Sequence, residues 1–180
     1  MTLSELEAVI VSERLDLVLM SNNFMLASLS ASIAEAEALL GARLPRSWPD
    51  NYARAVIERR LRQIAAAPGD APWLLRAMVR REDGRVVGCV NFHGPPNEEG
   101  QAELGYTVFE DERRQGYATE AILAMMLRAR EVRGVRRFLL SISPANEASL
   151  RLAAKLGFQR IGSQIDEIDG EEQVFELVQP

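Results

Sequence analysis

The sequence predicts an α+β fold in which a mixed, mostly antiparallel β-sheet is flanked by helices. Two observations predict it. Pairs of strand-like segments joined by Gly-containing turns occur in the middle and at the end of the chain, and they are typical of β-hairpins. Between these pairs, two helical segments each separate one strand from the next, as crossover connections do. A length of 180 residues fits one domain, which we expect to span residues 1–180.

The first third of the chain is predicted to contain one strand and three helices. Apolar residues alternate over residues 14–20, as in a strand. Helical periodicity follows in three segments with recognisable boundaries: a cap at Asn22 or Asn23, Gly41 after residues 32–40, and Pro49 at the first position of a helix that continues past Ile64.

The remaining elements are predicted from strand and helix patterns in turn. In chain order, we expect a hairpin (73–80 and 85–92, turning at 82–84), a loop (93–100), a strand (103–109), a helix from Ala118 through Arg130, a strand (138–143), a short helix from Asn146 that ends at Gly157, and a closing hairpin (159–165 and 173–178) that turns through Asp169 and Gly170.

The turn between the strand at 103–109 and the following helix has the pattern of an anion site. It reads Arg113-x-x-Gly116-x-Ala118, and such a loop aims unpaired backbone N–H groups at one point. Gly116 can adopt a positive φ and admit a ligand to the main chain, while Ala118 keeps the first helical turn uncrowded. With the helix dipole, the arrangement suits a pyrophosphate. The alternative is an ordinary helix N-terminus with solvated arginines.

These residues resemble the acyl-CoA signature of the GNAT superfamily of N-acetyltransferases. Four blocks are similar to the branch that contains the ribosomal-protein N-terminal acetyltransferases: Glu-Leu-Gly-Tyr at 103–106, Arg-x-x-Gly-Tyr-Ala-Thr-Glu-Ala at 113–121, Asn-Glu-Ala-Ser at 146–149 and Lys-Leu-Gly-Phe at 155–158. The resemblance covers Trp73 to Leu177, and the N-terminal third only by element order. Glu110, Glu112 and Thr107 depart from the pattern, and we expect them to affect the acceptor pocket.

The resemblance implies a GNAT-like fold and acetyl-CoA as co-substrate. The expected activity is acetyl transfer to a primary amine, which is either a protein N-terminus or a small amine such as an amino acid, a polyamine or an antibiotic. Direct attack in a ternary complex is expected, because no activated nucleophile is visible. The residues that we expect to bind the cofactor are Tyr106, Val108, Arg113, Arg114, Gln115, Gly116, Tyr117, Ala118, Thr119, Asn146 and Ser149.

Glu103 and Ser149 are the candidate catalytic residues. The resembled branch often has a glutamate at the position of Glu103, and that glutamate deprotonates the amine. Glu103 would need a raised pKa to do so. The alternative is an exposed carboxylate paired with an arginine. Asn146 is expected to cap a helix by accepting the Ser149 backbone N–H, and the Ser149 hydroxyl could protonate the leaving thiolate. Tyr106, on the other face of the strand, is expected in the core or the acceptor pocket.

Net charge, apolar runs and the counts of histidine and cysteine restrict the kinds of ligand and partner that we expect. A net charge of −5 without a long basic run argues against nucleic acid, and no apolar run is long enough to span a bilayer. Acidic residues at the N-terminus do not suit a signal peptide, so we expect a cytoplasmic protein. One histidine and one cysteine make a metal site improbable; His93 fits a turn and Cys89 a buried inert thiol. The sequence is compatible with a homodimer. Trp48 is expected in the core or an interface, or alternatively in the acceptor groove.

A non-catalytic module that senses CoA or a nucleotide is the rival function. It would use the same anion loop at 113–118 and would have no need of Glu103.

Overall fold

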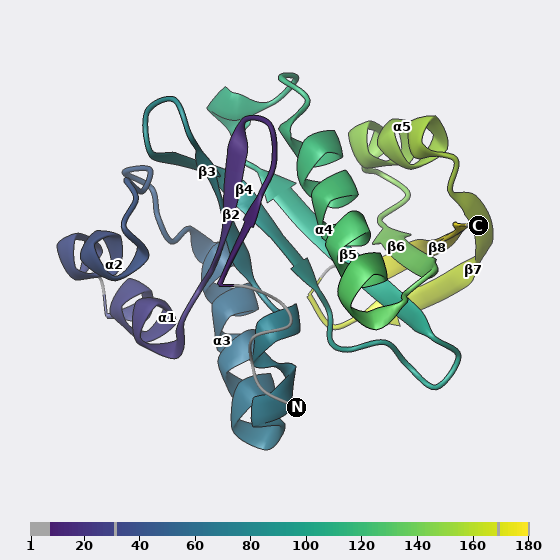
Figure 1. The fold of residues 1–180 in the computed structure, drawn as a ribbon, viewed down its shortest axis with the longest axis horizontal. Coiled ribbons are helices and arrows are strands. Elements are labelled where there is room, and N and C mark those ends of the chain that lie inside the picture. The colour runs from purple at the N-terminus through teal and green to yellow at the C-terminus, as the bar shows by residue number, and fades with distance from the viewer. Residues whose placement is uncertain (1–7, 31, 169, 180) are drawn as a thin grey trace.

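The computed structural model describes residues 8–30, 32–168 and 170–179. Its strands form one mixed sheet in the order β1-β2-β3-β4-β5-β6-β8-β7, and only β5 and β6 run parallel. The α+β fold predicted from the sequence is therefore confirmed (Figure 1). The strands are β1 (Val9–Val11), β2 (Leu15–Leu19), β3 (Arg76–Arg80), β4 (Arg85–Phe92), β5 (Gln101–Val108), β6 (Arg137–Ile142), β7 (Gln159–Asp166) and β8 (Gly170–Val178).

The N-terminal helices are α1 (Asn22–Leu29), α2 (Ile33–Leu40) and α3 (Asn51–Ala66). Two predicted boundaries were wrong. The cap of α1 is Ser21, whose side chain accepts the Phe24 backbone N–H, so Asn22 is already helical. The cap of α3 is Asp50, which accepts from the Ala53 N–H, and Pro49 lies before it. In both cases a side-chain acceptor one residue from the predicted boundary satisfies the first turn.

Two further predictions failed in this half. The three-residue edge strand β1 was not foreseen; it pairs antiparallel with β2. The strand expected from Trp73 begins only at Arg76, because Pro68–Trp73 forms a 3₁₀ helix. The N-terminal residues 1–7 and the expected turn residue Asp169 lie outside the described residues.

The second half follows the prediction closely. Helix α4 (Tyr117–Arg133) follows β5 after a short 3₁₀ turn, and α5 (Glu147–Leu156) follows β6. Gly157 ends α5 at φ 86°, and the Phe158 N–H donates to the Ala153 carbonyl at 3.0 Å. This left-handed cap and the return of Phe158 into the core confirm the predicted helix end.

Two apolar clusters fill the two faces of the sheet. Helix α4 lies across one face, where Ile122 and Met126 join Leu17, Phe92 and Leu104 in one cluster. Helices α1, α2 and α3 form the other cluster with side chains from β3 and β4. Figure 1 shows α4 and α5 on the side of the molecule away from α1 and α2. The central strands β3 and β4 are therefore buried on both faces, whereas β5 is half-buried from Gly105 on and β7 is exposed along most of its length.

The parallel pair β5 and β6 separates before either strand ends. Their register runs from Gln101 opposite Arg137 to Leu104 opposite Leu140 and stops there. Beyond that point β5 continues to Val108, still paired with β4, while β6 leads into α5. The divergence leaves one edge of β5 without a strand partner, and it positions the candidate site.

Candidate active site

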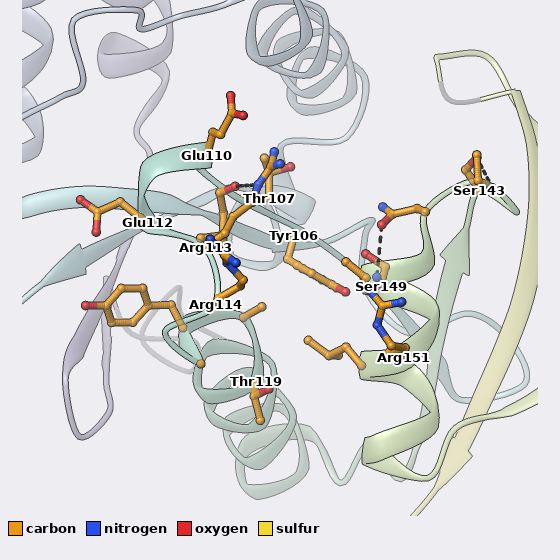
Figure 2. Close-up of a pocket in the computed structure, with 18 residues that line it drawn as sticks. Tyr106, Thr107, Glu110, Glu112, Arg113, Arg114, Thr119, Ser143, Ser149 and Arg151 are labelled. Atoms are coloured by element: carbon orange, nitrogen blue, oxygen red, sulfur yellow. Dashed lines mark hydrogen bonds between the residues drawn. The ribbon is translucent and has the colours of Figure 1, made fainter.

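A cavity of about 1040 Å³ opens where β5 and β6 diverge. The second half of β5, the loop before α4 and the first turns of α4 and α5 line it (Figure 2). Such a size and position suit an extended ligand.

The loop that leads into α4 exposes backbone donors. Gly116 is the N-cap of α4 at φ 84°, and Arg114 also has a left-handed backbone at φ 62°. Helices α1, α3 and α5 each begin with a side-chain cap, but α4 has none. Its first-turn N–H groups therefore remain available to a ligand in the cavity, and the dipole of a 17-residue helix favours an anion there.

Arg113 and Arg114 add positive charge to this loop, and both line the cavity. The Arg113 Nε atom donates to the Val108 carbonyl at 3.1 Å, which fixes the side chain against the end of β5. Gln115 does not line the cavity, contrary to expectation. Its side chain instead lies between Glu112 and the hydroxyl of Tyr117, since an αL residue on each side turns it away.

Arg14, on the β1–β2 hairpin, holds the loop from outside. Its guanidinium donates to the Gln115 carbonyl at 2.9 Å and to Glu120 at 2.7 Å, and it lies 4.8 Å from the centre of the Tyr117 ring. Nothing in the local sequence of the loop indicates this clamp.

Glu110 and Glu112 line the large cavity, whereas we expected them to affect the acceptor pocket. Glu112 is neutralised by Arg80, whose Nη1 atom lies 2.6 Å from its carboxylate. Glu110 is exposed at the rim. Since one of the two acids is paired, the cavity keeps a net excess of arginine near Gly116.

Asn146 and Ser149 form the opposite wall. The Asn146 side chain accepts the Ser149 backbone N–H at 3.1 Å, as predicted for a cap. Figure 2 shows the phenol of Tyr106 directed from β5 toward Ser149. The Tyr106 hydroxyl is buried and makes no hydrogen bond of regular geometry among the described residues. Burial raises the pKa of Tyr106, and the contact with Ser149 partly opposes that rise. Two hydroxyls therefore face the cavity side by side.

Glu103 lies near a second opening, at the His93 loop. The Ser141 hydroxyl donates to Glu103 Oε1 at 2.5 Å, and His93 Nδ1 lies 3.4 Å from the same oxygen. Among the described residues no arginine pairs with Glu103, so the predicted alternative of an arginine-paired carboxylate does not describe it. Glu103 is instead a partly buried group shared by a serine and a histidine.

The pKa of Glu103 is lowered, opposite to what we stated a base would need. Burial alone would raise this pKa, but the contacts from His93 and Ser141 outweigh burial. A carboxylate with a lowered pKa stays ionised and is a weaker base. Its Oε1 atom, 3.4 Å from His93 Nδ1, can orient the neighbouring imidazole.

His93 is the member of this pair that lines the second opening. A Cβ atom at Gly105 would lie 2.7 Å from His93 Nε2, so the imidazole covers the bare backbone of Gly105. The backbone carbonyl of His93 accepts a hydrogen bond from Gln63 Nε2 at 2.9 Å, and this bond fixes the start of the loop that follows β4. The sequence predicted only a turn residue at position 93. That His93 lies opposite Glu103 follows from the way β4 pairs with β5, which the local sequence does not reveal.

A narrower pocket of about 80 Å³ lies beside His93, between α3 and the sheet. Trp48, Cys89 and Gly105 line it, and Tyr106 and Thr107 line both this pocket and the large cavity. Thr107 and Trp48, both expected near the acceptor, line this narrow pocket. Trp48 is also buried in the α1–α3 cluster, so its predicted place in the core is confirmed.

All the residues expected to bind the cofactor line the large cavity, except Gln115. Arg151 also lines it and was not foreseen, because an arginine on the second turn of a short helix carries no local signal. No described helix is both long and apolar enough to cross a membrane. Within the same residues, no three histidine, cysteine or acidic side chains gather as metal ligands.

Comparison with known proteins fits this geometry. Residues 25–159 match the acetyltransferase (GNAT) domain family, which is most of the chain. The chain belongs to the GNAT family. Its fold resembles that of a Vibrio cholerae protein assigned as a ribosomal-protein-serine acetyltransferase, with a TM-score of 0.65 at 23% identity over 96% of this chain and 98% of that one.

Two other proteins are similar to this chain, one in fold and one in sequence. The microcin C7 self-immunity acetyltransferase MccE, solved with acetyl-CoA and AMP, has a TM-score of 0.62 at 16% identity over 92% of this chain and 93% of that one. The uncharacterised N-acetyltransferase YoaA of Bacillus subtilis is 32% identical over 83 residues. That match covers 46% of this chain and 47% of YoaA, so this chain aligns with about half of that relative.

Proposed function

We propose that this GNAT protein transfers an acetyl group from acetyl-CoA to a primary amine. One observation carries the proposal: the large cavity and the narrow pocket meet at β5, where Tyr106 and Thr107 line both. A thioester on one side of the strand can then meet an amine on the other side. Membership of the family supports the same reaction class.

The loop residues would hold the pyrophosphate of CoA. The uncapped N–H groups of α4 and the charges of Arg113 and Arg114 match a diphosphate in charge and direction. The carbonyl oxygen of Val108 and the side chain of Asn146 lie farther along the cavity, where the pantetheine arm would run toward Ser149. Tyr117, Ala118 and Thr119 complete the floor.

His93 and Glu103 would act together on the amine. We assign His93 as the group that accepts the amine proton, because it borders the narrow pocket and presents Nε2 above Gly105. Glu103, 3.4 Å from Nδ1, would orient the ring and stabilise its protonated form. This division of roles replaces the expectation that Glu103 itself is the base.

Direct attack by the amine is favoured over an acyl-enzyme. Cys89 is the thiol at the pocket, and burial raises its pKa to about 12, so it stays neutral and a poor nucleophile. The nitrogen–carbon bond then forms as the carbon–sulfur bond breaks, and the proton needed by the departing sulfur would come from Ser149 or from Tyr106 beside it.

Initial rates with both substrates varied test this proposal. Release of CoA that requires both an amine and acetyl-CoA, with intersecting double-reciprocal lines, is the expected result. Parallel lines would contradict direct attack, because they indicate an acyl-enzyme. Stabilisation by acetyl-CoA with no CoA release from any amine or N-terminal peptide would favour the rival sensor module.

A further inference from the structure

The narrow pocket contains an arginine that the proposed chemistry does not use. Arg60, on α3, is only 5% exposed and lines the pocket beside His93. Its Nη1 atom donates to Gln63 Oε1 at 2.8 Å and approaches the His93 carbonyl at 3.5 Å. These contacts fix the guanidinium on the wall of the pocket.

Arg60 has no counter-ion among the residues that the structure describes. Its Nε atom is buried without an acceptor, and neither Asp166 nor Glu103 forms an ion pair with Arg60. Asp166 is held by Arg59 through two contacts of 2.9 Å, and Glu103 by Ser141 and His93. Burial, followed by the charge of Arg59, lowers the pKa of Arg60, and the charges of Asp166 and Glu103 oppose this shift only in part. A cation so buried and unpaired is costly to the fold, which favours a role in binding an anion.

The rest of the pocket restricts where such an anion can lie. Trp48, Val56, Leu75 and Phe109 supply aromatic and aliphatic walls. The acidic residues that also line the pocket have partners: Asp50 caps α3, Asp166 is held by Arg59, and Glu172 accepts from Gln164. The Arg60 guanidinium contacts the main chain of His93, whose imidazole faces Glu103, so the anion would lie next to the proposed site of amine deprotonation. A pocket of about 80 Å³ has the volume of about three waters at ~30 Å³ each. Only a small ligand, such as an amine and a carboxylate joined by one carbon, would fit it.

We propose that the acceptor is a small amino acid-like amine and that Arg60 binds its carboxylate. The proposal rests on acetyl transfer at this site. A guanidinium suits a carboxylate because its planar N–H groups can match both oxygens. The amine then points toward His93, and any apolar substituent contacts the walls near Trp48. A protein N-terminus, whose first residue has an amide in place of the carboxylate, would leave Arg60 unpaired.

Matched substrates test the assignment. The kcat/KM of the wild-type protein is measured for amino acids, for the corresponding amino acid amides and for N-terminal peptides. The amides have the less basic amine and would react faster without recognition, so a preference for the free carboxylate must come from binding. In Arg60→Met the kcat/KM for the acids should fall about 100-fold while that for the amides changes little.

Arg62 supplies the control on the same helix. It is exposed and lies outside the pocket, so Arg62→Met should leave both values unchanged. Arg60→Lys should recover only part of the preference, because an ammonium lacks the planar fork. Removing an unpaired buried cation should not lower the melting temperature of Arg60→Met. A large loss of melting temperature, or an equal loss for acids and amides, would overturn the proposal.

A binding measurement separates this proposal from the activity itself. With CoA present, N-acetyl amino acids should raise the melting temperature of the wild type and not that of Arg60→Met, and the N-acetyl amides should raise neither. Failure of all acetyl transfer would overturn the proposed function. Transfer to amines or peptides with no preference for a carboxylate, and no such shift, would overturn the role of Arg60 alone.

Discussion

Glu103 Oε1 lies 3.4 Å from His93 Nδ1, and this contact joins β5 to the residue after β4 at the narrow pocket, which His93 lines. Gly105, two residues along β5, has no side chain to obstruct the imidazole above it. Glu103 therefore contacts the imidazole, and the imidazole, not the carboxylate, lines the narrow pocket in which we propose that the amine binds. The contact assigns different roles to the two residues.

Replacing Glu103 should affect catalysis but not cofactor binding. In Glu103→Gln we expect turnover to fall roughly 10²-fold, a usual size for a lost acid–base partner. The rise in melting temperature caused by acetyl-CoA should persist, because Glu103 does not line the large cavity. Turnover near the wild-type value would show that Glu103 is structural.

The same variant should change the pH dependence of stability. The pKa of Glu103 is lowered in the folded protein from its ordinary value of 4.5, so the ionised carboxylate adds to the free energy of unfolding above that pH. The contribution disappears as pH falls through the folded value. The wild type should therefore exceed Glu103→Gln in melting temperature most at neutral pH and lose that advantage as the pH falls below 4.5 and through the folded pKa. If the two melting temperatures differed by the same amount from neutral to acidic pH, the lowered pKa of Glu103 would be contradicted.

Replacing His93 should lower turnover, and this loss should not add to the loss caused by replacing Glu103. In His93→Gln turnover should fall by roughly 10² to 10³, with acetyl-CoA binding retained. The double variant should lose little more than His93→Gln alone, because the two residues act on one proton. Fully additive losses would mean that the residues act independently.

The fold and the cofactor loop could be predicted because their signals are local. Gly116 and Gly157 both adopt the left-handed conformations expected of them, and Asn146 caps the helix that it precedes. Each of these depends on a few neighbouring residues. The edge strand β1 escaped prediction because three residues are too few to show a period.

The acceptor side could not be predicted because it is assembled by tertiary contacts. Arg60 is on α3 and His93 follows β4, yet both border one pocket with Gly105 of β5. The helical pattern of α3 indicates which residues are apolar, and it carries no information about a buried arginine turned toward the sheet. The lowered pKa of Glu103 likewise depends on His93 and Ser141, which lie far from it in sequence.

Gly116 should be essential for binding acetyl-CoA. A valine there must adopt φ 84°, and its Cβ would lie 3.3 Å from Arg14 Nη2, so it would strain the loop and disturb the contact that holds it. Gly116→Val should therefore abolish the rise in melting temperature caused by acetyl-CoA. Gly134, at φ 66° on the other end of α4, is the control: Gly134→Val suffers similar strain but should keep the shift. A normal shift in folded Gly116→Val would refute the pyrophosphate site.

Ser149 can be tested apart from the helix cap. Its backbone N–H reaches Asn146 whatever its side chain, so Ser149→Ala should barely change the melting temperature. Asn146→Ala should lower it by about 2–4 °C, as expected for a lost cap of about 1 kcal/mol. If the hydroxyl protonates the thiolate, kcat of Ser149→Ala falls roughly 10- to 100-fold, and less so with thioesters of more acidic thiols. A fall in acetyl-CoA affinity alone would limit Ser149 to holding the pantetheine arm.

The central claim is acetyl transfer from acetyl-CoA to an amine at the junction of the two pockets. The most direct measurement is mass spectrometry of the amine after incubation with acetyl-CoA and protein, alongside the rate of CoA release. We predict an N-acetylated product formed in equal amount to the CoA released, with both greatly reduced in His93→Gln. CoA release without acetylated amine, or product formed equally well by His93→Gln, would contradict the account.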